Sequence, residues 1–185
     1  MARAGLDRAR IIAVAADMAD EVGLAQVTFV KLAAELKVKP PSLYNHVESM
    51  AALMDELAMR ALAGLLDLAR GAVMGRVGWD ALEALAHSQR AYAKAHPGLF
   101  TATFRSLHGR GERAERIANA YLGVYLAVLR SYGIEGAHAL HKIRCLRAAI
   151  GGFIELELRG GFGLSLNVDE SFQQLLKMLA VGIEH

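Results

Sequence analysis

Residues 27–47 of the chain read VTFVKLAAELKVKPPSLYNHV. Leu32 and Leu36 lie four positions apart, which places them on one face of a short helix whose charged residues face outward. Pro40 and Pro41 then force the preceding residues out of α geometry and pre-set the first turn of another helix. The stretch therefore predicts a short amphipathic helix, a tight break and a second short helix.

The second of these helices has a buried side and a polar side. Leu43 and Val47 are four positions apart, so we expect them to enter the core together. The opposite side carries side chains that can bond to bases or phosphates, namely Ser42, Tyr44, Asn45 and His46. A reader of the DNA major groove needs a rigid helix with donors and acceptors in its first turns. The pattern is typical of a helix-turn-helix.

Nine residues of this stretch are candidate DNA contacts: Thr28, Lys31, Lys37, Lys39, Pro41, Ser42, Tyr44, Asn45 and His46. Asn45 can pair with adenine through two hydrogen bonds, and Lys39 can reach a phosphate or a guanine edge. The Thr28 hydroxyl can cap a helix whose free amides bind a phosphate. The alternative is that these are ordinary polar residues on a solvated bundle face, and spacing alone does not separate the two interpretations.

The composition limits the classes of protein. Of the 185 residues 54% are hydrophobic, and much of this share is Ala and Leu, which favour helices. No apolar run approaches the roughly 18 residues of a membrane span, so no membrane partner is expected. The net charge of +2 permits nucleic acid as a partner without requiring it. The single Cys145, with no apolar leader after Met1, predicts a protein of the reducing cytoplasm.

The remaining chain repeats the helical period, and strand alternation is scarce. Asp7 is the expected cap of the first helix, Gly23 is its expected end, and Ser49 can cap the helix that follows residue 48. After residue 48, helices are expected over Met50–Met74, Trp79–Ala95, Leu99–Leu107, Glu112–Tyr132, Gly136–Arg159 and Asp169–Ile183. The sequence therefore predicts an all-α protein of about nine helices. Residues 1–48 would form an N-terminal three-helix bundle with the helix-turn-helix, and residues 49–185 a larger helical domain for ligand binding and dimerisation.

Aromatic and polar residues of the larger domain are candidates for a ligand pocket, which is usually apolar with a few convergent polar groups. The candidates are Gln89, Tyr92, His96, Phe100, Phe104, Tyr121, Tyr125 and His141. The alternative for each is plain core packing. The aromatic character favours an apolar or aromatic ligand.

The last two helices carry the strongest apolar faces, and terminal helices with broad apolar faces need a partner. The candidate dimer contacts are Ile143, Leu146, Ile150, Ile154, Phe172, Leu175, Leu176 and Leu179.

His138, His141 and Cys145 share a helical face at i, i+3 and i+7, a spacing that could hold zinc or copper. No fourth ligand is evident, and both residue types also pack without metal, so no metal or other cofactor is predicted. Nucleophile elbows, phosphate-binding glycine loops and His-Glu-x-x-His motifs are absent from the sequence. An enzyme is therefore not expected.

One group of residues resembles a known family: Thr28, Leu32-Ala33, Leu36, Val38, Pro41-Ser42-Leu43-Tyr44, His46-Val47 and Leu53. Over Ala9–Leu57 the chain resembles the N-terminal domain of the TetR/AcrR transcriptional regulators. The resemblance implies a homodimer on a double-stranded DNA operator, more often a repressor than an activator, released when a small-molecule effector binds the C-terminal body. The stretch from Trp79 onward is similar to the Trp-His-Gly subfamily, although Gly151-Gly152-Phe153 replaces the usual His-Gly-Phe.

Three departures from the family pattern concern DNA affinity. Lys37 replaces the usual turn glycine, and a non-glycine residue is less comfortable at positive φ. Val30 and Met50 stand where Arg and Lys are frequent in the family. Each phosphate contact that is lost lowers the slope of log K for DNA binding against log salt concentration by about one. Either operator binding is weaker than usual, or it rests on Arg3, Arg8 and Lys31. The second functional hypothesis is a helical ligand-binding or protein-interaction module with weakened DNA binding.

Overall fold

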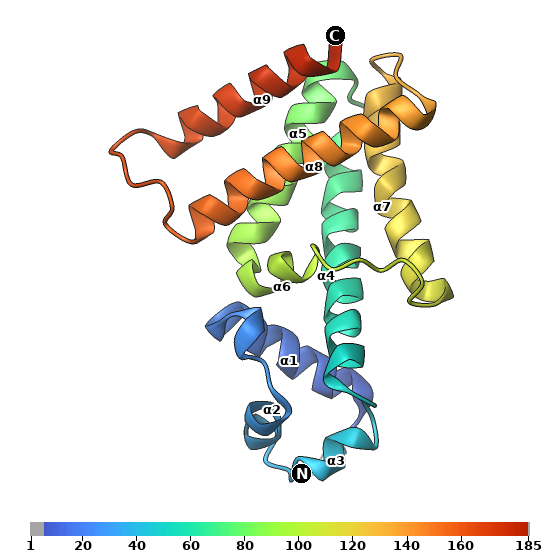
Figure 1. The fold of residues 1–185 in the computed structure, drawn as a ribbon, viewed down its shortest axis with the longest axis vertical. Coiled ribbons are helices and arrows are strands. Elements are labelled where there is room, and N and C mark those ends of the chain that lie inside the picture. Colours follow the sequence, from blue (N-terminus) through green and yellow to red (C-terminus); the bar gives the residue numbers. More distant parts are fainter. Residues whose placement is uncertain (1–5, 185) are drawn as a thin grey trace. The chain divides into compact units, whose positions relative to one another are not determined.

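The computed structural model describes residues 6–184. In this range the chain is entirely helical, with nine α-helices, one 3-10 helix (η1) and no strand, as the sequence predicts (Figure 1). The helices are α1 (Arg8–Val22), η1 (Leu24–Gln26), α2 (Phe29–Glu35), α3 (Pro41–Tyr44), α4 (Met50–Val73), α5 (Gly78–Ala95), α6 (Pro97–Ala102), α7 (Glu112–Arg130), α8 (Gly136–Leu158) and α9 (Val168–Glu184). None of the helices in the described range is long and apolar enough to cross a membrane.

The chain divides into two compact units. Unit 1 comprises Met1–Leu62 and His96–Glu115, and unit 2 comprises Ala63–Ala95 and Arg116–His185. Unit 1 thus contains α1, η1, α2, α3, the first half of α4 and α6, and unit 2 contains α5, α8, α9 and most of α7.

Polar side chains start three of the helices as the sequence predicts. Asp7 accepts a hydrogen bond from the amide of Arg10 at 2.8 Å and caps α1. The Thr28 hydroxyl accepts from the amide of Lys31 at 3.3 Å and caps α2. Ser49 does the same for the start of α4, with the amide of Ala52 at 3.1 Å. Each cap satisfies an amide that a helix start otherwise leaves unpaired.

The helix expected over Leu99–Leu107 is shorter and starts earlier, at Pro97. Proline is favoured at the first helical position because its missing N–H would have no partner there, which explains the earlier start. Beyond Ala102 the backbone tightens, because the amide of Arg105 bonds to the Ala102 carbonyl three residues back. Phe104 lies in this turn and is exposed, although its ring packs edge-on against that of Phe100 at 5.4 Å.

Helices α1 and α6 meet in unit 1 at a glycine. A Cβ atom at Gly98 would lie 1.9 Å from the carbonyl oxygen of Ala19 on α1, so only glycine fits. The next α1 residue, Asp20, accepts a hydrogen bond from the amide of Leu99 at 2.9 Å. Its other oxygen is 2.8 Å from Nδ1 of His96. The Asp20 carboxylate therefore joins the end of α1 to the beginning of α6.

Two neighbouring carboxylates of α4 gather arginines within unit 1. Glu56 is buried and accepts hydrogen bonds from Arg8 of α1 and Arg113 of α7, each at 2.9 Å. Asp55 pairs with Arg105 and Arg110 of the segment between α6 and α7. A buried carboxylate is tolerated only with such partners. The two acids therefore fix α1 and the segment after α6 to the first half of α4.

In unit 2, a buried arginine holds α5, α8 and α9 together. Arg90 donates two hydrogen bonds of 2.6 Å to Glu157 of α8 and pairs with Asp169 of α9 at 2.7 Å. Its guanidinium also lies 4.9 Å from the ring centre of Phe172. The hydrogen bonds from Arg90 lower the pKa of Glu157. Stabilisation from this carboxylate is therefore present above its unfolded-state pKa and is lost as the pH falls through the lower folded-state pKa.

We expect Glu157→Gln to lower the free energy of unfolding at neutral pH by about 2 kcal/mol, because it removes one of the two carboxylates that pair with the buried Arg90. Chemical denaturation at a series of pH values measures the effect. The difference from wild type should shrink as the pH falls below the unfolded-state pKa of glutamate, because wild-type Glu157 becomes neutral as the pH falls through its lowered folded-state pKa. Glu83→Gln, at a half-buried carboxylate of α5, is the control. A pH-independent difference would contradict the assignment.

Candidate nucleic-acid interface

Helix α3 is only four residues long, and its position depends on two apolar anchors. Leu43 and Val47 are almost completely buried in unit 1, as the sequence predicts. The amide of Val47 bonds to the carbonyl of Leu43 at 2.9 Å, which keeps the two side chains on one side. Pro41 occupies the first helical turn. A helix this short has little stability of its own, so buried contacts hold it in shape.

The turn between α2 and α3 is closed by a left-handed residue. Lys37 has a φ of 55°, and it is the only residue other than glycine with positive φ among residues 6–184. The amide of Val38 bonds to the carbonyl of Ala33 at 2.9 Å, and that of Lys37 to the carbonyl of Ala34 at 3.1 Å. This pair of bonds is the Schellman ending of a helix. The turn has the conformation that glycine favours, with a lysine in that position.

The structure brings all nine candidate DNA contacts together in unit 1, on α2, on α3 or in the turns beside them. Ser42 and His46 are half-buried. The other seven are exposed: Thr28, Lys31, Lys37, Lys39, Pro41, Tyr44 and Asn45. The residues that the sequence singles out therefore lie on neighbouring elements of unit 1, and we call them together the polar surface around α3.

Tyr44 is fixed by an aromatic contact that the sequence analysis missed. Its ring lies edge-on to Phe29 of α2, with centroids 4.9 Å apart and an interplanar angle of 82°. Phe29 is buried, whereas 56% of the Tyr44 surface is exposed. Such edge-to-face pairs contribute about 1 kcal/mol beyond burial. Phe29 therefore orients the Tyr44 ring while more than half of the Tyr44 surface stays in solvent.

The basic residues near this surface differ in whether they are exposed and whether another side chain of the protein already pairs with them. Arg8 is engaged with Glu56, and Arg3 lies outside the described residues. Lys31 is exposed, and its ammonium group donates to the side-chain oxygen of Gln26 at 2.8 Å. Val30 is 70% exposed on α2, and Met50 is half-buried at the start of α4. An apolar side chain thus occupies an exposed position of α2 where a cation would be accessible.

Four of the predicted pocket residues are buried in unit 2, and three of them are joined by side-chain contacts. The Tyr125 hydroxyl donates to the side-chain oxygen of Gln89 at 3.1 Å, and the rings of Tyr121 and Tyr125 pack edge-on at 5.5 Å. Tyr92 covers Gly64, where a Cβ atom would come within 3.1 Å of its ring. Burial raises the pKa of Tyr125 and raises that of Tyr121 well above its ordinary value, so both hydroxyl groups stay neutral.

The other four predicted pocket residues have different surroundings. His96, Phe100 and Phe104 belong to unit 1, where His96 pairs with Asp20 and Phe100 is buried. His141 is exposed on α8. His138 and Cys145 are exposed as well. Among residues 6–184, no three His, Cys, Asp or Glu side chains lie close enough together to hold a metal ion.

Six of the eight candidate dimer contacts are buried within the chain itself: Ile143, Leu146, Ile150, Ile154, Phe172 and Leu176. Their side chains are covered by unit 2, so they are core residues in the single chain and cannot contact a partner directly. Leu175 and Leu179 are half-buried. The exposed large apolar residues of the same two helices are Leu140, Leu156, Met178 and Val181, which the sequence analysis missed.

Comparison with known proteins gives two family matches. Residues 11–57 match the family described as "Bacterial regulatory proteins, tetR family". Residues 82–179 match the family described as "Tetracyclin repressor-like, C-terminal domain". The chain is also 30% identical over 182 residues to YobS, an uncharacterized HTH-type transcriptional regulator of Bacillus subtilis strain 168, covering 98% of this chain and 94% of YobS.

Two solved structures are similar over nearly the whole chain. A TetR variant from Acinetobacter baumannii AYE in complex with minocycline has a TM-score of 0.73 and 26% identity, with 97% of each chain covered. BioQ with its natural double-stranded DNA operator has a TM-score of 0.69 and 23% identity, covering 97% of this chain and 99% of BioQ. At 23% identity, the similarity to BioQ shows that the two chains share a fold.

We expect Lys37→Gly to be more stable than Lys37→Ala by about 1 kcal/mol, because only glycine adopts the left-handed conformation without steric cost. Both variants remove the same charge, so their difference reports on the backbone alone. Thermal and urea denaturation of the two proteins measure it. Equal stability would show that the turn relaxes out of the left-handed region in the alanine variant.

Proposed function

Because the chain belongs to the tetR family of bacterial regulatory proteins, and is therefore a DNA-binding transcriptional regulator with a ligand-binding C-terminal domain, we propose that it is a repressor that a small molecule releases from its operator. Regulators of this family are transcription factors and not enzymes. The observation that carries the proposal is the polar surface around α3, held by Leu43, Val47 and the Phe29–Tyr44 contact.

In this proposal α3 enters the major groove and reads base edges. Asn45 and Ser42 bond to bases, and the exposed part of the Tyr44 ring presses on a thymine methyl group or the backbone. Phosphates are bound by Lys37, Lys39 and the start of α2 around Thr28, and His46 donates a hydrogen bond to another phosphate. Lys31 adds a further cation, and Pro41 packs against a sugar. The exposure of seven of these nine residues supports this assignment.

The effector in our proposal is an apolar or aromatic molecule bound by the C-terminal domain. Tyr92, Tyr121, Tyr125 and Gln89 supply aromatic walls and a polar pair for it. Neutral tyrosine hydroxyl groups suit an uncharged ligand, because burying a charge in an apolar site without a partner is unfavourable. His96, Phe100, Phe104 and His141 remain candidates for its contacts. The complex of the similar Acinetobacter baumannii protein with minocycline supports a small-molecule effector.

We further propose a homodimer that joins through the outer faces of α8 and α9. The exposed Leu140, Leu156, Met178 and Val181 on these faces support it. Ala148 and Gly152 are exposed on α8 between them, and such small residues permit a close helix approach. Leu175 and Leu179, half-buried in the single chain, would lie at the edge of this interface.

Release would be a population shift. The effector favours a conformer in which α4 swings and the two α3 helices of the dimer no longer lie one turn of DNA apart. The protein would act in the cytoplasm, where its operator is. The similarity to the Trp-His-Gly subfamily stays a prediction. The second hypothesis, a ligand-binding or interaction module with weakened DNA binding, is favoured by the exposed Val30 and by Met50.

Loss of operator binding is expected for Tyr44→Ala and for Asn45→Ala, because each removes a side chain that we place in the groove. Gel-shift titrations against the DNA upstream of its own gene, at low and moderate salt, measure binding. We expect a loss of at least about tenfold for each, since a good base contact contributes 1–3 kcal/mol. Val30→Ala, exposed on α2, is the matched control.

Gel filtration with light scattering should show both variants as dimers. Wild-type protein without any saturable, sequence-dependent binding would exclude the repressor and support the second hypothesis. Normal binding by both variants would mean that α3 is not the reading helix.

Restoring the missing cations gives a second test of the DNA surface. We expect Val30→Arg and Met50→Lys to strengthen operator binding at low salt and to steepen its dependence on salt concentration. Each new phosphate contact should add about 0.9 to the slope of log K against log salt. Fluorescence anisotropy over a range of salt concentrations measures the slope. Val30→Gln and Met50→Gln are neutral controls, and unchanged slopes in the cationic variants would place these positions away from the DNA.

A further inference from the structure

Helices α1 and α2 of unit 1 together line a groove of about 590 Å³. Its lining includes an apolar group, which is Val14, Met18 and Val22 of α1 with Ala34 of α2. It also includes an acidic group, which is Asp17 and Glu21 of α1 with Glu35 of α2. Lys31 is the only one of the nine candidate DNA contacts that lines this groove. The groove therefore shares little with the polar surface around α3.

The apolar group follows from the spacing of residues along α1. Val14, Met18 and Val22 are four positions apart, so they share a face that extends over about 12 Å, or two helical turns. The buried residues of α1 lie on its other face, and they are Ile11, Ala15, Ala16 and Ala19. Val22 is 53% exposed, and Val14 and Met18 are half-buried. Single exposed apolar residues are common, but a row of them along a groove indicates an interaction surface.

The acidic group differs from other carboxylates of unit 1. A histidine or an arginine pairs with each of Asp20, Asp55 and Glu56. In the part of the chain that the structure describes, no ion pair or side-chain hydrogen bond involves the acidic group. The ammonium group of Lys31 donates to Gln26. Because Asp17 and Glu21 are four positions apart on one helix, their like charges repel. A cation bound in the groove would relieve this repulsion.

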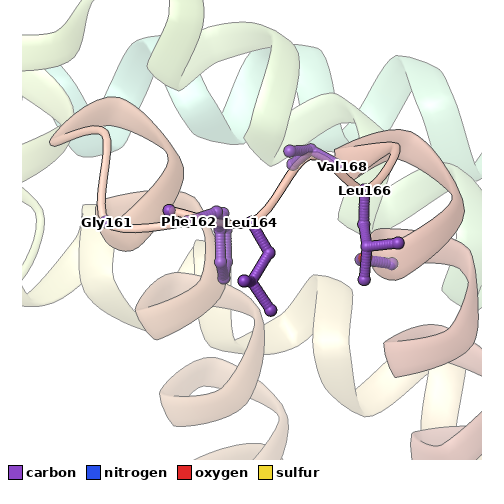
Figure 2. A pocket seen from close by; sticks show the side chains of 7 residues that line it. Gly161, Phe162, Leu164, Leu166 and Val168 are labelled. Atoms are coloured by element: carbon purple, nitrogen blue, oxygen red, sulfur yellow. The ribbon is translucent and has the colours of Figure 1, made fainter.

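The loop between α8 and α9 has a pocket with a different lining. This pocket measures about 300 Å³, and Figure 2 shows Phe162, Leu164, Leu166 and Val168 around it. Among the described residues that line it, none is charged. An apolar lining alone fits many occupants, whereas the α1–α2 groove combines apolar contacts with three carboxylates. The groove therefore selects an occupant that is both apolar and cationic.

We propose that the α1–α2 groove binds a basic amphipathic helix of another protein. Two packed helices leave a hollow that the side chains of a third helix can fill, and helix-in-groove binding is a common mode of recognition. Apolar side chains on one face of the partner helix pack on the apolar group over two turns. Its lysines or arginines pair with the acidic group, and the opposite charges steer its approach. The flexible side chain of Met18 adapts to the partner surface.

A designed peptide serves as the probe. It has about 14 residues, with Leu at i, i+3, i+4 and i+7 positions and Lys at the others. Fluorescence anisotropy with the full chain measures binding, and we expect saturable binding that weakens as the salt concentration rises. A scrambled peptide of the same composition should bind at least about tenfold more weakly, because it cannot present one apolar face. Equal binding of the two peptides, or no saturable binding of either, would overturn the proposal.

A triple variant removes the charges of the acidic group: Asp17→Asn, Glu21→Gln and Glu35→Gln. These side chains are exposed, so circular dichroism should show an unchanged fold. We expect a loss of at least about tenfold in affinity for the amphipathic peptide, with a flatter salt dependence. The matched control removes three exposed carboxylates elsewhere: Glu48→Gln, Asp67→Asn and Asp80→Asn. Equal binding by the two triple variants would place the peptide outside the groove.

Val22→Ser tests the apolar group. We expect about a fivefold loss of affinity for the amphipathic peptide, because the partly exposed valine gains contacts in the complex. Val30→Ser is the control, since Val30 is 70% exposed on α2 and does not line the groove. In protein labelled at its methionine methyl groups, the peptide should shift the NMR resonance of Met18. The resonance of Met74, which is 78% exposed beyond the end of α4, should not move. An unmoved Met18 resonance would overturn the proposal.

The same measurements distinguish two other occupants. Spermine carries several cations but has no apolar helical face. Complete displacement of the peptide by spermine at equal charge, together with unchanged peptide binding by Val22→Ser, would assign the groove to small polycations and overturn the helix. Sedimentation equilibrium of the chain alone tests for a second copy. Self-association that the acidic-group variant abolishes would make another copy of this chain the occupant, and would also overturn the proposal.

Discussion

The backbone of α6 passes so close to α1 at Gly98 that no side chain fits between them. Asp20 uses this proximity, because its carboxylate accepts from the amide of Leu99 and pairs with His96. Helix α1 also packs against α2, so the helix that contacts α6 supports the reading surface as well. A change in the position of α6 would therefore also displace α1, because the two helices are in close contact at Gly98 and are joined by the hydrogen bond between Asp20 and Leu99.

A second set of contacts reinforces this arrangement from α4. Glu56 holds Arg8 at the start of α1, and Asp55 holds two arginines that follow α6. Consecutive residues of one helix point in different directions, so the pair reaches two different segments. Polar groups thus fix both ends of α1 in unit 1, Arg8 at its start and Asp20 near its end.

The sequence was most informative where short-range rules apply. The caps Asp7, Thr28 and Ser49 and the paired Leu43 and Val47 follow from residue type and spacing within a few positions, and the structure confirms them. The left-handed conformation of Lys37 follows from its place in the turn.

Contacts between distant parts of the chain were not predictable in the same way. Arg8 and Glu56 are 48 positions apart, and Arg90 and Glu157 are 67 apart. The packing of the folded chain decides which distant residues become partners, and no pattern of neighbouring residues in the sequence predicts them. One signal was available, because Glu56 lies on the apolar side of α4 and an acid there needs a partner. The apolar period of α8 correctly indicated a buried face, but period alone does not say whether the same chain or another covers it.

The dependence of α3 on Leu43, Val47 and Phe29 has a thermodynamic consequence. Many recognition segments become ordered only on contact with their target, and that ordering opposes association entropically. Here the four-residue helix is already ordered by the core of unit 1, and the Tyr44 ring is already aimed by Phe29. The conformational entropy of α3 is lost when the protein folds, before the protein meets any target. In the proposed complex, differences in affinity among DNA sequences would therefore reflect the contacts themselves and the deformation of the DNA, with little contribution from folding of α3.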